Sequence, residues 1–101
     1  NREALEVNRN SINNRQLYHF NTEFVIWTAD IPQSSDKYLA LFNISDGKTP
    51  IEVGVNWDQL GLADSVCQVR DVWAGKDLGS FTGRFASSIP AHGAGLYRIT
   101  E

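Results

Sequence analysis

Residues 51–57 read Ile-Glu-Val-Gly-Val-Asn-Trp, and apolar side chains occupy every second position of this stretch. Side chains of a β-strand alternate between the two faces of a sheet, so one face receives Ile51, Val53, Val55 and Trp57. The two polar residues and the glycine face the other way. This period is typical of an antiparallel sheet with one buried face, and it predicts such a strand here.

Further short segments rich in β-branched and aromatic residues flank this one. The candidate strands are Arg15–Phe20, Phe24–Asp30, Lys37–Ile44, Ile51–Trp57, Ser65–Val72, Gly79–Ile89 with a bend, and Ala94–Thr100. Turn clusters separate them, including Ala74-Gly75-Lys76-Asp77 and the dipeptide Asp46-Gly47, a strong hairpin signal because tight hairpin turns need positive φ. Short strands at this spacing predict an all-β fold, an antiparallel Greek-key β-sandwich of about seven or eight strands.

The same alternation predicts the core. We expect it to include Ile26, Leu39, Leu41, Val53, Val55, Val69, Phe85 and Ile99. The segment Phe24–Ala29 differs, because its first four residues are all apolar and leave neither face polar. Such a strand is covered on both sides, and in a chain of 101 residues part of the cover can come from outside. Val25 and Trp27 are therefore the candidate residues of an interface, within a large apolar surface patch.

The N-terminal residues are helical in character but too few to form a stable helix alone. The polar run Asn8–Asn14 follows them and favours turns. We expect residues 1–14 to be the end of a helix and a linker, and residues 15–101 to be the β-domain. The chain contains no methionine and opens at Asn1, so we expect it to be a fragment of a longer protein or a processed product.

Composition excludes several functions. The net charge is -3, so no broad basic surface is available for nucleic acid. No apolar run is long enough to cross a bilayer, and we expect no membrane partner. The single cysteine, Cys67, allows no internal disulfide and fits a buried strand position. His19 and His92 lie far apart without metal-ligand spacing around them, so we expect no metal and no cofactor.

Residues 69–79 read Val-Arg-Asp-Val-Trp-Ala-Gly-Lys-Asp-Leu-Gly. They resemble the late motif of glycoside hydrolase family 27, the α-galactosidases and α-N-acetylgalactosaminidases, which carry a similar Val-Arg-Asp-Leu-Trp stretch followed by Lys-Asp-Leu-Gly. Supporting similarity lies in Val25–Trp27, Tyr38–Asn43, Phe81–Phe85, Ile89–Ala94 and the opening Asn1–Asn8, which looks like the end of the last barrel helix. The family usually continues with Asn-Gln-Asp, where this chain has Asn8-Arg9-Asn10.

The resemblance implies that this chain is the C-terminal β-sandwich of a parent whose (β/α)8 barrel carries the active site. That parent would hydrolyse terminal α-galactosyl or related α-glycosidic bonds. The family's catalytic aspartates lie on the barrel, and no segment here matches their motifs, so the resemblance implies no catalytic residue and no enzyme in this chain alone. Its partner would be the barrel of the same parent chain, and the resemblance favours a secreted or periplasmic location.

One pair of carboxylates could suggest catalysis, because retaining glycosidases use two carboxyl groups about 5 Å apart. Asp71 and Asp77 flank Trp73. Asp71 ends a strand beside Arg70, however, and Asp77 falls in the predicted turn, where aspartate side chains accept hydrogen bonds from backbone N–H groups. We therefore expect structural roles for both.

Three tryptophans leave a second function open. Sugar rings stack on exposed aromatic faces, but tryptophan is also a large core filler. Alternation buries Trp57, Trp27 belongs to the doubly apolar strand, and Trp73 remains as the candidate for carbohydrate binding. The main hypothesis is a non-catalytic accessory domain that packs on and stabilises the barrel. The alternative is a carbohydrate-binding module that uses exposed Trp or Tyr.

Asn43-Ile44-Ser45 is a formal N-glycosylation sequon. It matters only for a protein that is secreted from a eukaryote.

Overall fold

The computed structural model describes residues 2–20, 23–47, 49–63 and 65–101, apart from the side chains of residues 8 and 18–20. In chain order its elements are α1 (Arg2–Asn10), β1 (Ile12–Phe20), β2 (Phe24–Asp30), β3 (Lys37–Asn43), β4 (Ile51–Asn56), the 3-10 helix η1 (Trp57–Leu60), β5 (Val66–Asp71), β6 (Lys76–Thr82), β7 (Arg84–Ile89) and β8 (Ala94–Thr100). Neither helix has the length and apolar character that crossing a membrane requires.

The strands form two antiparallel sheets. The larger sheet has six strands in the order β1-β2-β3-β8-β5-β6, and the smaller sheet pairs β4 with β7. The chain leaves the larger sheet after β3, returns for β5 and β6, crosses again to β7 and comes back as β8 between β3 and β5. These crossings confirm the expected antiparallel Greek-key β-sandwich.

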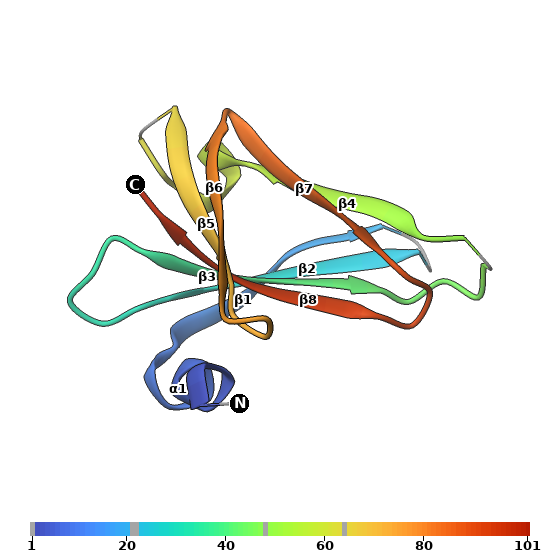
Figure 1. Ribbon diagram of the computed structural model, residues 1–101, viewed down its shortest axis with the longest axis horizontal. Coiled ribbons are helices and arrows are strands. Elements are labelled where there is room, and N and C mark those ends of the chain that lie inside the picture. Colours follow the sequence, from blue (N-terminus) through green and yellow to red (C-terminus); the bar gives the residue numbers. More distant parts are fainter. Residues whose placement is uncertain (1, 21–22, 48, 64) are drawn as a thin grey trace.

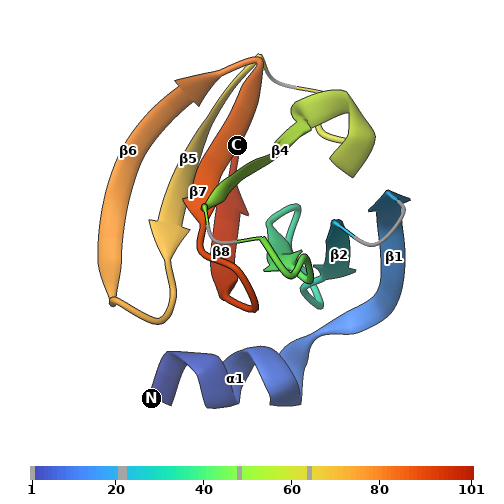
Figure 2. The same ribbon diagram turned by 90° about the vertical axis from the view of Figure 1, so that its right-hand side faces the viewer.

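The larger sheet has two differently covered faces. The smaller sheet lies over its inner face, and α1 lies against its outer face (Figure 1). Figure 2 shows the larger sheet curving, so that its edge strands β1 and β6 rise on either side of β4. The inner face therefore closes on the domain's own core, whereas the outer face has only one short helix to cover it.

The core lies between the two sheets and contains every side chain that alternation predicted. The eight predicted residues are at most 3% exposed: Ile26, Leu39, Leu41, Val53, Val55, Val69, Phe85 and Ile99. Phe85 also stacks edge-to-face on Phe81 and Tyr97, with ring centroids 5.0 and 4.8 Å apart. Such aromatic pairs add to the free energy that burial of their surface already supplies.

The hairpin predicted at Asp46-Gly47 was wrong. The strands on either side of this dipeptide, β3 and β4, belong to different sheets, so the segment is a crossover and not a turn between paired strands. At this end of the sandwich the Asp46 carboxylate lies 3.2 Å from Nε2 of His92, in the turn between β7 and β8. Turn-forming residues marked a change of direction, but they carry no information on which strand pairs next.

The segment Gly79–Ile89 is two strands and not one bent strand. Gly83 separates β6 from β7 with a φ of +77°, a backbone conformation that favours glycine. Its N–H donates to the Ser65 carbonyl at 2.6 Å, and its carbonyl accepts the Trp57 N–H at 3.0 Å. The predicted turn at 74–77 was also too long, because β6 begins at Lys76 and includes Asp77.

The polar run Asn8–Asn14 is not a simple linker. The helix continues to Asn10, and β1 begins at Ile12, three residues before the predicted start. Asn13 has a φ of +55°, which asparagine tolerates better than most residues, and the pairing of β1 with β2 is irregular there. The Asn13 side chain donates to Asp30 at 2.9 Å, so its polarity serves a contact within the sheet.

Candidate functional site

The outer face of the larger sheet carries a band of apolar side chains. The register places Trp27 opposite Ala40 and Ala40 opposite Leu96, and the next row aligns Val25 with Phe42 and Ala94. We call these six residues the outer apolar face. Trp27 is 39% exposed, and the other five are half-buried. The predicted interface residues Val25 and Trp27 therefore lie side by side on an accessible surface, and their contact with a barrel stays a prediction.

Helix α1 covers the neighbouring part of this same surface. Val7 packs against Ala29, Ile31 and Tyr38, which are all buried. On the opposite side of the helix, Leu5 is 58% exposed. The doubly apolar strand β2 is thus covered by the chain itself at Ala29, whereas its Trp27 remains accessible.

An ion-pair network fastens α1 to the sheet. The Arg70 guanidinium donates to both carboxylate oxygens of Glu3, from Nε at 3.0 Å and from Nη2 at 2.7 Å. Its Nη1 donates to Asp77 at 2.8 Å. Bidentate pairs of this kind fix geometry as well as supplying attraction. The hydrogen bonds from Arg70 lower the pKa of the Glu3 carboxyl, and those to Glu3 and Asp77 raise the pKa of Arg70.

A groove of about 440 Å³ runs beside this network, between α1 and strands β5, β6 and β8. Its charged lining consists of Glu3, Glu6, Arg70, Asp77 and Arg98. No aromatic ring lines it among the described residues, so it offers a sugar no stacking surface. Its arginines bind carboxylates of the same chain, since Arg98 donates to Asp36 at 2.9 Å.

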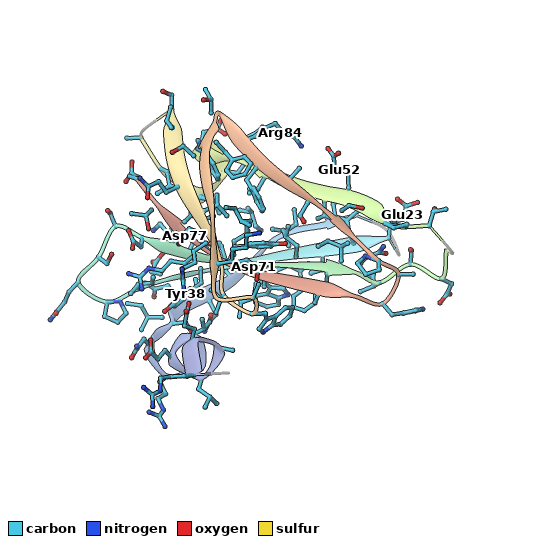
Figure 3. The ribbon with its side chains drawn as sticks, viewed as in Figure 1. Glu23, Tyr38, Glu52, Asp71, Asp77 and Arg84 are labelled. Atoms are coloured by element: carbon cyan, nitrogen blue, oxygen red, sulfur yellow. The ribbon has the colours of Figure 1, made fainter. Side chains whose placement is uncertain are left out.

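The two carboxylates that flank Trp73 do not face each other. Arg70 pairs with Asp77 in the register of β5 and β6, and Asp71 pairs with Lys76. Adjacent positions of a strand point to opposite faces, so Asp71 and Asp77 lie on opposite faces of this hairpin. Figure 3 labels both residues at the hairpin. They cannot act together on one glycosidic bond in this arrangement.

The structural roles predicted for these two aspartates are partly right. Asp71 accepts the backbone N–H of Ala74 at 3.0 Å, so it has the turn role that was expected for Asp77. Asp77 has no turn role, because it lies within β6 and binds Arg70.

The three tryptophans differ in exposure, and Trp57 is buried as alternation predicted. Trp57 is 2% exposed, and its Nε1 donates to the Phe81 carbonyl at 3.0 Å. Trp73 is 49% exposed and lies two residues after the end of β5. Trp27 and Trp73 are therefore the two tryptophans whose rings reach the surface.

The remaining candidate residues gather into no chemical centre. Within the part of the chain that the structure describes, no three His, Cys, Asp or Glu side chains are placed to hold a metal ion. Cys67 is a buried core residue. The side chain of His19 lies outside the described residues, and His92 is an exposed turn residue.

The sequon residue Asn43 is fully buried. Its Nδ2 donates to the Ile89 carbonyl at 2.8 Å. Its Oδ1 accepts from the backbone N–H and the hydroxyl of Ser45, at 3.1 and 2.7 Å. The amide nitrogen that a glycan would need is thus committed to the fold.

Sequence reasoning missed the Arg70 network and the other members of the outer apolar face. Glu3 and Arg70 are 67 positions apart, so no local pattern links them. The alternating residues of Tyr38–Phe42 and the apolar Leu96 were a usable signal for the outer face, once the register of β3 and β8 is known.

This architecture defines the class: a β-sandwich domain with a helix packed on the outer face of its larger sheet. The chain belongs to the family described as the alpha galactosidase C-terminal beta sandwich domain, whose model matches residues 21–99. No protein with a curated description matches the sequence.

Several solved structures are similar to the chain over nearly its whole length. A family 27 β-L-arabinopyranosidase from Geobacillus stearothermophilus is 31% identical with a TM-score of 0.89, over 100% of this chain and 22% of that one. α-Galactosidase I from Mortierella vinacea is 22% identical with a TM-score of 0.81, over 98% and 26%. A putative α-N-acetylgalactosaminidase from Bacillus halodurans is 23% identical with a TM-score of 0.86, over 100% and 23%. The chain thus spans about a quarter or less of each relative's length, and the two less identical structures support the fold alone.

Proposed function

We propose that this chain is the non-catalytic accessory domain of an α-galactosidase-like glycoside hydrolase, and that it packs on a (β/α)8 barrel and stabilises it. The outer apolar face carries this proposal. Its strands completely bury the inner side chains of Leu39, Leu41 and Ile99, yet they keep Trp27 at 39% exposure beside a helix that covers part of the same face. Large accessible apolar patches on soluble domains mark contact sites.

The arrangement of carboxylates supports a non-catalytic role. Asp71 and Asp77 lie on opposite faces of their hairpin, and each already binds a partner within the chain. Hydrolysis of a glycosidic bond needs an acid and a nucleophile that flank the same bond. The reaction is therefore assigned to the barrel of the parent protein.

The relatives support a role that is independent of the substrate. Structures described as a β-L-arabinopyranosidase, an α-galactosidase and a putative α-N-acetylgalactosaminidase all share this sandwich, with TM-scores from 0.81 to 0.89. Stabilising a common barrel accounts for a shared fold without a shared substrate.

Activity of the isolated chain tests the non-catalytic part of the proposal. The purified chain is incubated with an activated aryl α-galactoside, beside an Asp71→Asn, Asp77→Asn double variant as the matched control. We expect no turnover above the blank from either protein. Turnover that disappears in the double variant would contradict the proposal, and turnover that survives in it would point to another site in the chain.

A carbohydrate-binding role is the second candidate, and the 49% exposure of Trp73 favours it. Stacking of a sugar ring on this indole would change its fluorescence and its NMR signals. Titration with galactose, melibiose and galactomannan tests the idea, with Trp73→Ala as the variant and buried Trp57 as the internal reference. Millimolar or tighter binding that Trp73→Ala abolishes would establish this function, and no binding would remove it.

A further inference from the structure

A small hollow lies within the outer apolar face, beside α1. Its volume is about 70 Å³, and most of its lining is apolar: Val7, Trp27, Ala29, Tyr38, Ala40 and Leu96, with Asn14 and Thr28. The register explains the hollow, because the small Ala40 stands between the larger Trp27 and Leu96 on neighbouring strands. The Thr28 hydroxyl is already bound to the Tyr38 carbonyl at 3.0 Å, so it offers little to a polar ligand.

The size of the hollow decides what it can hold. Binding sites for small molecules usually have volumes of about 300–1,000 Å³. A volume of about 70 Å³ is instead roughly that of two water molecules at about 30 Å³ each. This space suits a few methyl and methylene groups and is too small to enclose a sugar ring, so a single apolar side chain is the fitting occupant.

We propose that this hollow is a socket for one branched aliphatic side chain from the barrel of the same parent chain. The proposal rests on the proposed function and specifies where the two parts meet. The matched relatives extend far beyond the region that corresponds to this chain, which covers 22–26% of their lengths, so such proteins have other segments to supply the side chain. Val7 of α1 already packs on the adjoining residues Ala29 and Tyr38, and the occupant continues that contact across Ala40.

Substitutions that place a larger side chain of this chain in the hollow test the proposal. Ala40→Phe occupies the hollow, and Ala40→Leu fills it less; both are made in the full-length protein and in the 101-residue chain. The matched control is Ala86→Phe, on the outward side of the smaller sheet, where Ala86 pairs with Gly54. Because overfilling a packed contact is destabilising, we expect Ala40→Phe to lower the Tm of the full-length protein by about 2–4 °C, and Ala40→Leu by less.

In the 101-residue chain the hollow is open, so neither Ala40 variant should lower the Tm of the chain. Ala86→Phe should change the Tm of the chain and the Tm of the full-length protein equally. Equal effects of Ala40→Phe in the two proteins would overturn the socket. A concentration-dependent Tm of the chain that Ala40→Phe abolishes would also overturn it, by identifying a second copy as the occupant. Separate melting of sandwich and barrel in the wild-type full-length protein would instead remove the proposed function, a result that calorimetry distinguishes from failure of the socket alone.

Discussion

The two faces of the larger sheet are built from the same strands and differ in how they are covered. On the inner face, Leu39, Leu41 and Ile99 are completely buried against the smaller sheet. On the outer face, the intervening positions Ala40, Phe42 and Leu96 are only half-buried, and Trp27 is 39% exposed. Both sets of side chains are apolar, so hydrophobicity alone does not separate them. Their coverage does separate them: the inner residues are buried in the core of the domain, whereas the outer residues remain partly accessible.

The inner face should show the largest effect of a single substitution. Leu39→Ala removes a completely buried side chain and leaves a cavity, so we expect a loss of about 2–5 kcal/mol in the free energy of unfolding. Leu96→Ala on the outer face is the matched control, with an expected loss of about 1 kcal/mol because Leu96 is half-buried. Urea denaturation of the chain measures both. Equal losses would break the distinction between the faces.

Asn43 is a buried polar residue on the inner face of the same sheet. Its substitution should cause the next largest loss of stability. Asn43→Ala leaves the Ile89 carbonyl without its donor in a buried position, which costs about 1–3 kcal/mol. Ser45→Ala is a milder control, since it removes only the hydroxyl donor to Asn43. Thermal unfolding measures the two variants. A Tm for Asn43→Ala at or above that of the wild type would contradict the structural role assigned to this sequon residue.

Loosening α1 from the outer face should have a smaller effect on stability than Leu39→Ala or Asn43→Ala. Arg70→Gln removes the bidentate pair with Glu3 and keeps the apolar contact of Val7, so α1 should open more often. Amide hydrogen exchange should become several-fold faster in α1 and stay unchanged in β3 and β8.

The control for this variant is Arg84→Gln, whose ion pair with Glu52 at 3.7 Å lies on the smaller sheet, on the side of the molecule away from α1 (Figure 3). It should leave the exchange of α1 unaltered. Unchanged protection of α1 in Arg70→Gln would contradict a role for this ion pair in holding the helix.

The smallest expected effect is a pH dependence at the end of β2 in the larger sheet. Lys37 and Asn13 donate hydrogen bonds to Asp30 and lower the pKa of its carboxyl to about 2. A lowered folded-state pKa stabilises the fold above the unfolded-state value of about 3.9, and this contribution is lost as the pH falls from about 4 to 2. Asp30→Asn should therefore flatten the loss of stability over this range, whereas the exposed Glu23→Gln should not. Parallel acid-unfolding curves for Asp30→Asn and the wild type would contradict this assignment.

The sequence predicted the inner face well because period-two alternation is a local property. All eight predicted core residues are buried, and the bounds of β2 and β8 were predicted correctly. Prediction from the sequence failed where a segment's structure depends on residues that are distant in the chain. Asp46-Gly47 has hairpin chemistry, but the strand that follows it pairs with β7 in the other sheet, which no local signal specifies.

The outer face shows the same limit. Residues 24–27 revealed that β2 is apolar on both sides, which identified Val25 and Trp27 as surface candidates. The row that joins Trp27 to Ala40 and Leu96 depends on the pairing of β2, β3 and β8, where Leu96 lies 69 positions after Trp27. The hollow at Ala40 follows from that register, so it could not be predicted from any one segment.

The accessibility of Trp27 in the two contexts tests the central claim most directly. Hydroxyl-radical footprinting with mass spectrometry compares the labelling of the three tryptophans in the 101-residue chain and in the full-length protein. Trp57, at 2% exposure, should label weakly in both, and Trp73 serves as the exposed reference. If the outer apolar face packs on the barrel, Trp27 should label readily in the chain and several-fold less in the full-length protein. Equal labelling of Trp27 in both proteins would contradict the account.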